Sequence, residues 1–106
     1  MKTIYNNIIP FKGFSAINLC GIVFARKEYK PLSERTINHE KIHTAQMKAL
    51  WYLPFLLWYV FEWVIKLFIY SKNSYYNISF EREAYNNELK FDYVEKRKKF
   101  AFLSYL

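Results

Sequence analysis

The chain has 106 residues, of which 53% are hydrophobic and 22% aromatic, yet its formal net charge is +7. A chain of this length builds one modest core, so the sequence predicts a single domain over residues 1–106. The single cysteine, Cys20, excludes an intrachain disulfide, and we expect it to be a small core residue. The N-terminus has no apolar stretch of signal-peptide length, which predicts a cytoplasmic location or the cytoplasmic face of the inner membrane.

The first predicted elements are one or two short strands in residues 14–26, FSAINLCGIVFAR. The segment lies between and after the two glycines, Gly13 and Gly21, and is rich in Ile, Val and Phe. We expect these strands to form a β-hairpin.

A first helix is predicted from about 34 to 52, because apolar residues recur there at helical spacing. Ser33 or Thr36 can cap its N-terminus. Pro54 lacks a backbone donor and crowds the preceding turn, so this helix kinks or ends there, and a second helix runs from Pro54 to about Tyr70.

A third helix is predicted after the polar connection 71–77, with Asn77 or Ser79 as its cap and residues 80–97 as its body. The last residues, KFAFLSYL, either continue this helix or dock on the core. Together the elements predict an α+β fold, mostly helical, in which a short N-terminal β-hairpin precedes three to four helices.

The first predicted helix carries both histidines of the chain in the motif H-E-x-x-H, formed by His39, Glu40 and His43. Residues i and i+4 share one helical face, so both imidazoles can reach one zinc ion. Zinc would lower the pKa of a water bound to it, and Glu40 would accept the proton as the water attacks a peptide carbonyl. The alternative is a chance match on a solvated helix.

A catalytic zinc needs a third protein ligand, and the remaining residue types leave a carboxylate for it. The metzincin pattern, which continues with Gly and a third His, is excluded because Gln46 and Ala49 occupy those positions. Two glutamates of the third predicted helix, Glu81 and Glu83, lie on different faces, so at most one of them can be the ligand.

The segments HEKIH and ISFEREAY resemble those of small gluzincin-type zinc metallopeptidases. They are similar to a group of short bacterial proteins with an HExxH motif, over about residues 18–93. The resemblance implies His39 and His43 as zinc ligands, Glu40 as general base and Glu81 as third ligand. Glu83 stays open as the competing ligand.

The chain departs from the gluzincin pattern at Tyr85, where many members have an Asp that orients a ligand histidine. Asn38, Gln46 or a backbone carbonyl can take that role. Glu88 lies on the face of Glu81 but about 10 Å further along a continuous helix, too far to bind the same ion.

Zincins commonly align an extended substrate on an edge strand, and by this resemblance the strand GIVFAR, residues 21–26, is a candidate. Tyr75 or Tyr76 is a candidate for stabilising the oxyanion, although packing is the more ordinary role for either.

Residues 49–70 are apolar except for Glu62 and Lys66, an i, i+4 pair on one helical face. A single membrane span here would separate His43 from Glu81, so we expect Pro54 to turn the chain into an antiparallel αα-hairpin. Its aromatic surplus predicts contact with a membrane surface or a protein partner. The basic run 96–99 is read as a solvated helix face, so nucleic acid is not an expected partner.

The sequence thus predicts a zinc-dependent metallopeptidase that acts on peptide or protein substrates. The alternative is a small membrane-associated subunit or binding module with a structural or inactive metal site.

Overall fold

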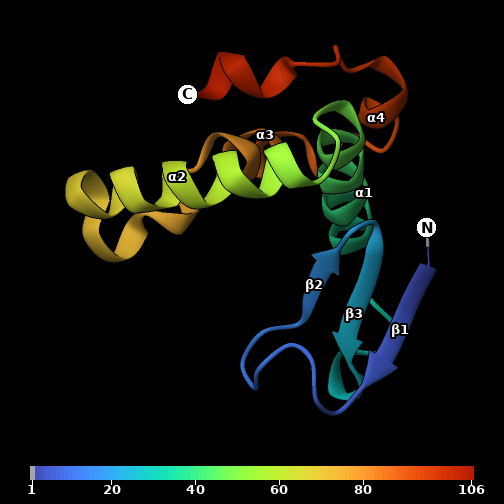
Figure 1. The fold of residues 1–106 in the computed structure, drawn as a ribbon. Coiled ribbons are helices and arrows are strands. Elements are labelled where there is room, and N and C mark those ends of the chain that lie inside the picture. The colour runs from blue at the N-terminus through green and yellow to red at the C-terminus, as the bar shows by residue number, and fades with distance from the viewer. Residues whose placement is uncertain (1) are drawn as a thin grey trace.

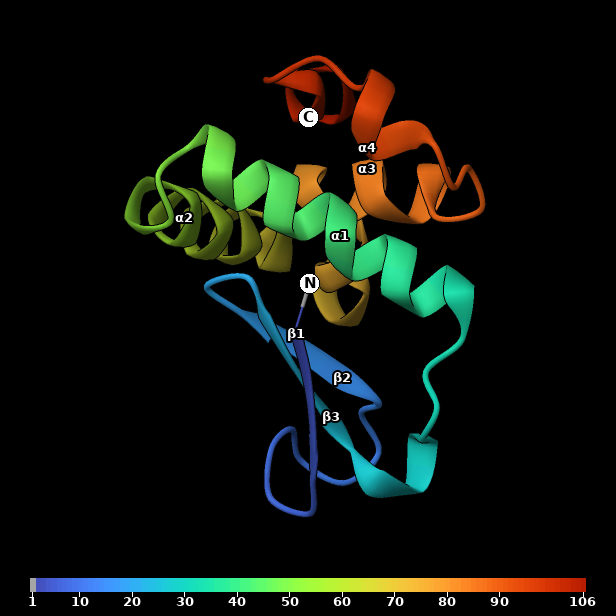
Figure 2. The same cartoon turned by 90° about the vertical axis from the view of Figure 1, so that its right-hand side faces the viewer.

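The computed structural model describes residues 2–106 and shows a small sheet packed on a group of helices (Figure 1). The chain begins with β1 (Lys2–Asn6), β2 (Ala16–Leu19) and β3 (Ile22–Arg26). Four α-helices follow: α1 (Glu34–Ala49), α2 (Leu53–Tyr70), α3 (Ser79–Asn87) and α4 (Tyr93–Lys96). Figure 2 shows α1 lying between the sheet and the C-terminal segment. The expected α+β fold, mostly helical, is confirmed.

The expected hairpin is formed by β2 and β3, which pair antiparallel through a two-residue turn. Both turn residues have positive φ, 53° at Cys20 and 88° at Gly21, as a type I′ turn requires. Cys20 is therefore exposed in the turn, and its expected place in the core is wrong. The sequence analysis also missed β1, which pairs parallel with β3 and gives the order β1-β3-β2.

Helix α1 begins as predicted, with the Ser33 hydroxyl accepting a hydrogen bond from the Thr36 N–H at 3.1 Å. It ends at Ala49, three residues earlier than expected, because Trp51 and Tyr52 have positive φ. Helix α2 then crosses α1 steeply rather than running back along it (Figure 1). The expected antiparallel αα-hairpin is wrong, and the chain returns to α1 through the short 3-10 helices between residues 71 and 77.

Helix α3 is capped from another helix. Its N-cap position is Ile78, and neither Asn77 nor Ser79 caps it. The Glu62 carboxylate instead accepts hydrogen bonds from the Ser79 N–H at 2.5 Å and the Ser79 hydroxyl at 2.6 Å. A carboxylate satisfies the free N–H groups at a helix start and favours its positive end, so the acid of α2 positions α3.

The expected long third helix is interrupted after Asn87. The Asn38 side chain of α1 donates hydrogen bonds to the carbonyls of Asn87, Glu88 and Lys90, at 3.3, 2.8 and 3.1 Å. These contacts satisfy carbonyls that a continuing helix would have paired internally, so α3 stops against α1 and the chain turns toward α4.

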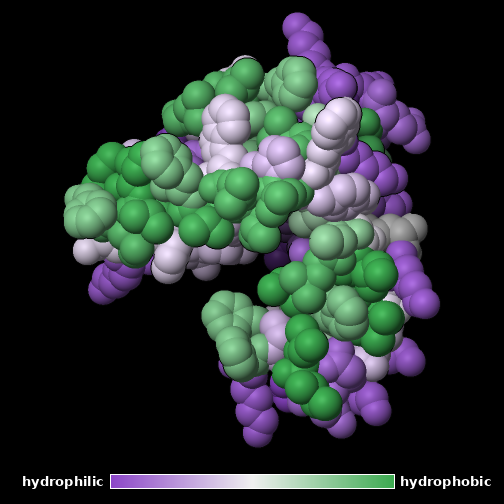
Figure 3. Space-filling view, viewed as in Figure 1, coloured by the Kyte–Doolittle hydropathy of each residue, from purple (hydrophilic) through white to green (hydrophobic). Residues whose placement is uncertain are grey.

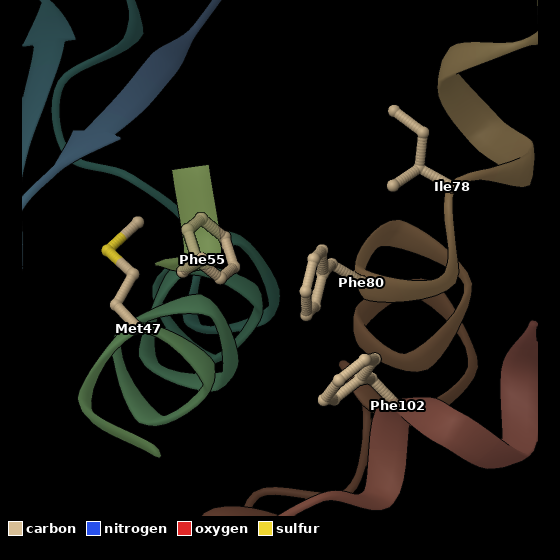
Figure 4. Close-up of a cluster of buried hydrophobic side chains, with 5 residues drawn as sticks. All are labelled: Met47, Phe55, Ile78, Phe80 and Phe102. Carbon is tan, nitrogen blue, oxygen red and sulfur yellow. The ribbon is translucent and has the colours of Figure 1, made fainter. Parts of the chain in front are cut away.

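Two buried apolar clusters hold the domain together. The first contains Val23 and Ala25 of β3 and Leu32, which precedes α1, and Ile37 of α1 packs against it. The second joins α1, α2, α3 and the C-terminal 3-10 helix Ala101–Tyr105, and Figure 4 shows its members pointing toward one another: Met47, Phe55, Ile78, Phe80 and Phe102. The last residues thus dock on the core, one of the two outcomes considered for them. The HExxH segment lies on α1, between the two clusters.

Candidate metal centre

The structure brings His39, His43 and Glu81 together as a buried group that could hold a metal ion. The Nε2 atoms of the two histidines are 3.1 Å apart, and each lies close to Oε1 of Glu81, at 3.2 Å from His39 and 3.0 Å from His43. The residues come from α1 and α3, which are joined by the second core cluster. Two separated helices therefore supply three convergent atoms, as the sequence required.

The hydrogen-bond partners fix which histidine nitrogens carry protons. The Glu88 carboxylate lies 2.9 Å from His39 Nδ1 and, as an acceptor, places the proton there. The Gln46 amide nitrogen donates to the carbonyl of Phe80 and to Glu83, so its oxygen faces His43 Nδ1 at 2.8 Å and accepts from it. Both Nε2 atoms are consequently left with lone pairs that face the Glu81 oxygen.

Three lone-pair atoms at this spacing repel one another unless a cation lies among them. A tetrahedral zinc ion with bonds of about 2.0–2.1 Å holds its ligand atoms about 3.3 Å apart. The observed separations of 3.0 to 3.2 Å are close to that value, so the residues present fit a divalent transition metal.

The electrostatics of the cluster agree with this requirement. Burial disfavours a charged imidazole, but the adjacent Glu81 carboxylate outweighs it and raises the pKa of His43 to about 10. Burial also disfavours an ionised Glu81, yet in this protonated state the charge of His43 and hydrogen bonding with the two histidine rings hold the Glu81 pKa well below its usual value. Without metal, the cluster holds a proton where the cation would lie.

The second oxygen of Glu81 is held by Tyr59 of α2, whose hydroxyl donates to Oε2 at 2.7 Å. Burial and the Glu81 charge raise the pKa of Tyr59, which keeps the phenol protonated as a donor. The contact leaves Oε1 as the Glu81 oxygen that faces the histidines.

Glu40 lies beside the cluster without belonging to it. Its side chain is buried, and burial raises its pKa while the neighbouring histidines oppose the shift. It lines two adjoining cavities of about 510 and 210 Å³, whose walls share Ala16, Ile17 and Tyr75. Glu40 thus places a carboxylate at the cavity wall, next to the three convergent ligand atoms.

The edge strand beside this groove is β2 and not β3. Strand β3 pairs on both sides, so the expected substrate strand, residues 21–26, has no free edge. The Arg26 N–H donates to the Ser15 carbonyl, and by antiparallel alternation the main-chain groups of Ala16 and Asn18 face away from β3. These groups lie on the strand that lines both cavities.

Glu83, the competing third ligand, points away from the histidines. Its carboxylate accepts two hydrogen bonds from Arg97, at 2.7 and 2.9 Å, and one from the Tyr93 hydroxyl at 2.8 Å. Together with the bond from Gln46, these contacts satisfy it fully. The two glutamates lie on different faces, as predicted, and it is Glu81 that the fold brings to the histidines.

Two residues at the candidate site, Glu88 and Asn18, were not predicted from the sequence to contact the HExxH helix. Glu88 contacts His39 Nδ1 because α3 ends at Asn87 and the chain bends back, so distances along a continuous helix do not apply to it. Asn18 donates to the Glu40 carbonyl at 2.9 Å and to the Thr44 hydroxyl at 2.8 Å, which fixes β2 against the HExxH helix. The 39-to-88 pairing had no local sequence signal. Gln46, considered for orienting a histidine, does so for His43.

Replacement of Glu88 by alanine is expected to weaken metal binding about 10- to 100-fold, because His39 loses the acceptor that fixes its tautomer. Competition with a chromophoric chelator measures this affinity. Glu95→Ala removes an exposed carboxylate and is the matched control. Equal affinities for the two variants would contradict the orienting role of Glu88.

Comparison with known proteins adds no family: no protein-family model matches the chain, and no match was found among curated proteins or solved structures. The likeness to gluzincins therefore rests on the buried His39, His43 and Glu81 cluster alone.

Proposed function

We propose that the protein is a zinc-dependent metallopeptidase with His39, His43 and Glu81 as metal ligands and Glu40 as general base. The observation that carries this proposal is the convergence of three lone-pair atoms beside a buried carboxylate that is not among them. A proton or a metal ion must fill such a cluster, and two histidines with one glutamate are the ligand set of a well-known class of catalytic zinc sites.

The number of ligands favours a catalytic over a structural metal. Structural zinc sites have four protein ligands, whereas catalytic sites have three and leave one position open. Within the described residues 2–106, no fourth His, Cys, Asp or Glu side chain joins the cluster. The adjoining groove, lined by Glu40, supports access of water and substrate to the open position.

Each of the surrounding residues has a chemical task in this proposal. A zinc ion held by His39, His43 and Glu81 would act as a Lewis acid and lower the pKa of a water bound to it. Glu40 would accept the proton of the attacking water and pass it to the leaving amine. Tyr75 borders both cavities, and burial with the nearby Glu81 charge raises its pKa, so its phenol stays protonated and can donate to the oxyanion.

The free edge of β2 supports an extended polypeptide as the substrate. The outward main-chain groups of Ala16 and Asn18 can pair with a peptide backbone and lay it along the groove, past Glu40. Main-chain pairing accepts many sequences, which fits a substrate defined by its extended shape. Apolar residues along the groove, among them Phe14 and Leu56, favour apolar side chains.

Purified protein loaded with one equivalent of zinc is expected to cleave an unfolded substrate such as casein at internal peptide bonds. Treatment with 1,10-phenanthroline should abolish cleavage, and stoichiometric zinc should restore it. Mass spectrometry of the products gives the cleaved bonds. If folded, zinc-loaded protein cleaves nothing, the proposal fails and the chain is better explained as a membrane-associated subunit or binding module.

A further inference from the structure

Helix α2 exposes nearly its whole circumference as apolar surface. Of its 18 residues only Phe55 and Glu62 are buried. The most exposed side chains include Phe61 at 67% and Phe68 at 88%. The only charged residues of the helix, Glu62 and Lys66, pair at 2.9 Å on the inner side. The outer side thus carries no charge, and such a surface on a small protein marks an interaction site.

A second apolar area lies on the same side of the molecule. The hairpin exposes Ile17, Leu19 and Ile22, and Figure 3 shows hydrophobic surface over both α2 and the sheet, with a hollow between them. The cavity next to the metal ligands lies between these areas, because Leu19 of β2 and Leu56 of α2 are both in its wall. We call α2 and the exposed hairpin side chains together the apolar face.

The segments that form the apolar face carry no exposed acidic residue. Residues 2–26 contain no Asp or Glu, and residues 49–80 contain only Glu62, which is buried and paired. Lys2, Lys12 and Lys72 are exposed in these segments. Apolar surface with lysines around it matches an anionic lipid bilayer. A second copy of the chain would bring these lysines together with no acid to pair them, so self-association is disfavoured.

By length and composition, helix α2 could cross a membrane over the stretch Leu53–Asn73, whose mean hydropathy is 1.5. Its inner side argues against a span. Tyr59 binds Glu81 and Glu62 binds Ser79, which holds the middle of α2 against α3 and the metal cluster. A span would carry those polar groups into hydrocarbon, whereas a helix lying in the interface keeps them inside the protein.

We propose that the apolar face docks on an anionic lipid bilayer, with α2 lying in the plane of the interface. The docked cleft then opens at the lipid surface, between α2 and β2. If the proposed peptidase function also holds, its preferred substrates are extended polypeptide segments at the membrane surface. The proposal that the apolar face docks on a bilayer rests on the exposed residues and does not depend on catalysis.

Tryptophan fluorescence tests this directly, because all three tryptophans, Trp51, Trp58 and Trp63, lie in or next to α2. Vesicles of phosphatidylglycerol and phosphatidylcholine should shift the emission to shorter wavelength, brominated lipids should quench it, and phosphatidylcholine alone should bind more weakly. The variant Phe61→Asp/Phe68→Asp should bind the mixed vesicles about tenfold or more weakly. The control Leu89→Asp/Phe91→Asp adds the same charge at exposed positions outside the apolar face and should bind normally.

Absence of vesicle binding would overturn the proposal, and so would a stable dimer in solution that Phe61→Asp/Phe68→Asp dissociates.

A measurement of peptide hydrolysis on vesicles distinguishes failure of the docking proposal from failure of the peptidase proposal. A peptide anchored to phosphatidylglycerol vesicles should be cleaved faster than the same soluble peptide, and the variant should lose only that advantage. Vesicle binding without any hydrolysis would leave the docking surface standing and remove the peptidase.

Discussion

Replacing Glu40 by glutamine is expected to lower kcat/KM for peptide hydrolysis by about 10²- to 10⁴-fold while the protein still binds one zinc ion. The amide keeps the shape of the side chain but cannot accept a proton. Metal binding persists because Glu40 is not one of the convergent ligand residues. Because burial already disfavours the charge of Glu40, its removal should not destabilise the fold. Hydrolysis rates and zinc content, measured on the same preparation, check both parts.

The same substitution at Glu34, which is exposed in the first turn of α1, is the matched control and should keep full activity. Loss of zinc from Glu40→Gln would make Glu40 a ligand, and undiminished hydrolysis would remove its role as a base. Either result contradicts the assignment.

A second large effect is expected from Glu83→Gln, which should lower the free energy of unfolding by about 3–5 kcal/mol. The substitution leaves the Arg97 guanidinium without its counter-charge. The loss is large because the pair is buried: the side chain of Glu83 is 0% exposed and that of Arg97 is 4% exposed. Urea denaturation measures the loss. The double variant Glu83→Leu/Arg97→Leu, which removes both charges, should recover much of it.

Asp92→Asn supplies the comparison, because the Asp92–Lys96 pair, at 2.6 Å, is exposed on both sides. Water screens such a pair, so its loss should change stability little. Equal effects of the buried and exposed substitutions would show that the Arg97–Glu83 contact does not hold the C-terminal segment.

The parts of the fold that local sequence determines were predictable. The hairpin follows from a turn of two residues, and the start of α1 follows from Ser33. Strand β1 was not predicted because its partner β3 is parallel and about twenty residues away, so no tight turn connects the two strands. The end of α3 was missed for a similar reason, since Asn38 of another helix binds the carbonyls that stop it.

The same division holds for the candidate site. Helical spacing put His39 and His43 on one face and separated Glu81 from Glu83. Which glutamate faces the histidines depends on Arg97, whose pairing with Glu83 no local pattern reveals. Glu88 reached the site only because the helix is shorter than its periodicity suggested.

Arg97, Glu83, Gln46 and His43 form a continuous chain of hydrogen bonds from the C-terminal segment to the metal ligands. A cation bound at His43 would therefore stabilise the docked arrangement of the C-terminal segment. By the same coupling free energy, docking of that segment would increase the affinity for the cation. Release of the C-terminal segment would therefore weaken cation binding, and loss of the cation would favour release of the segment.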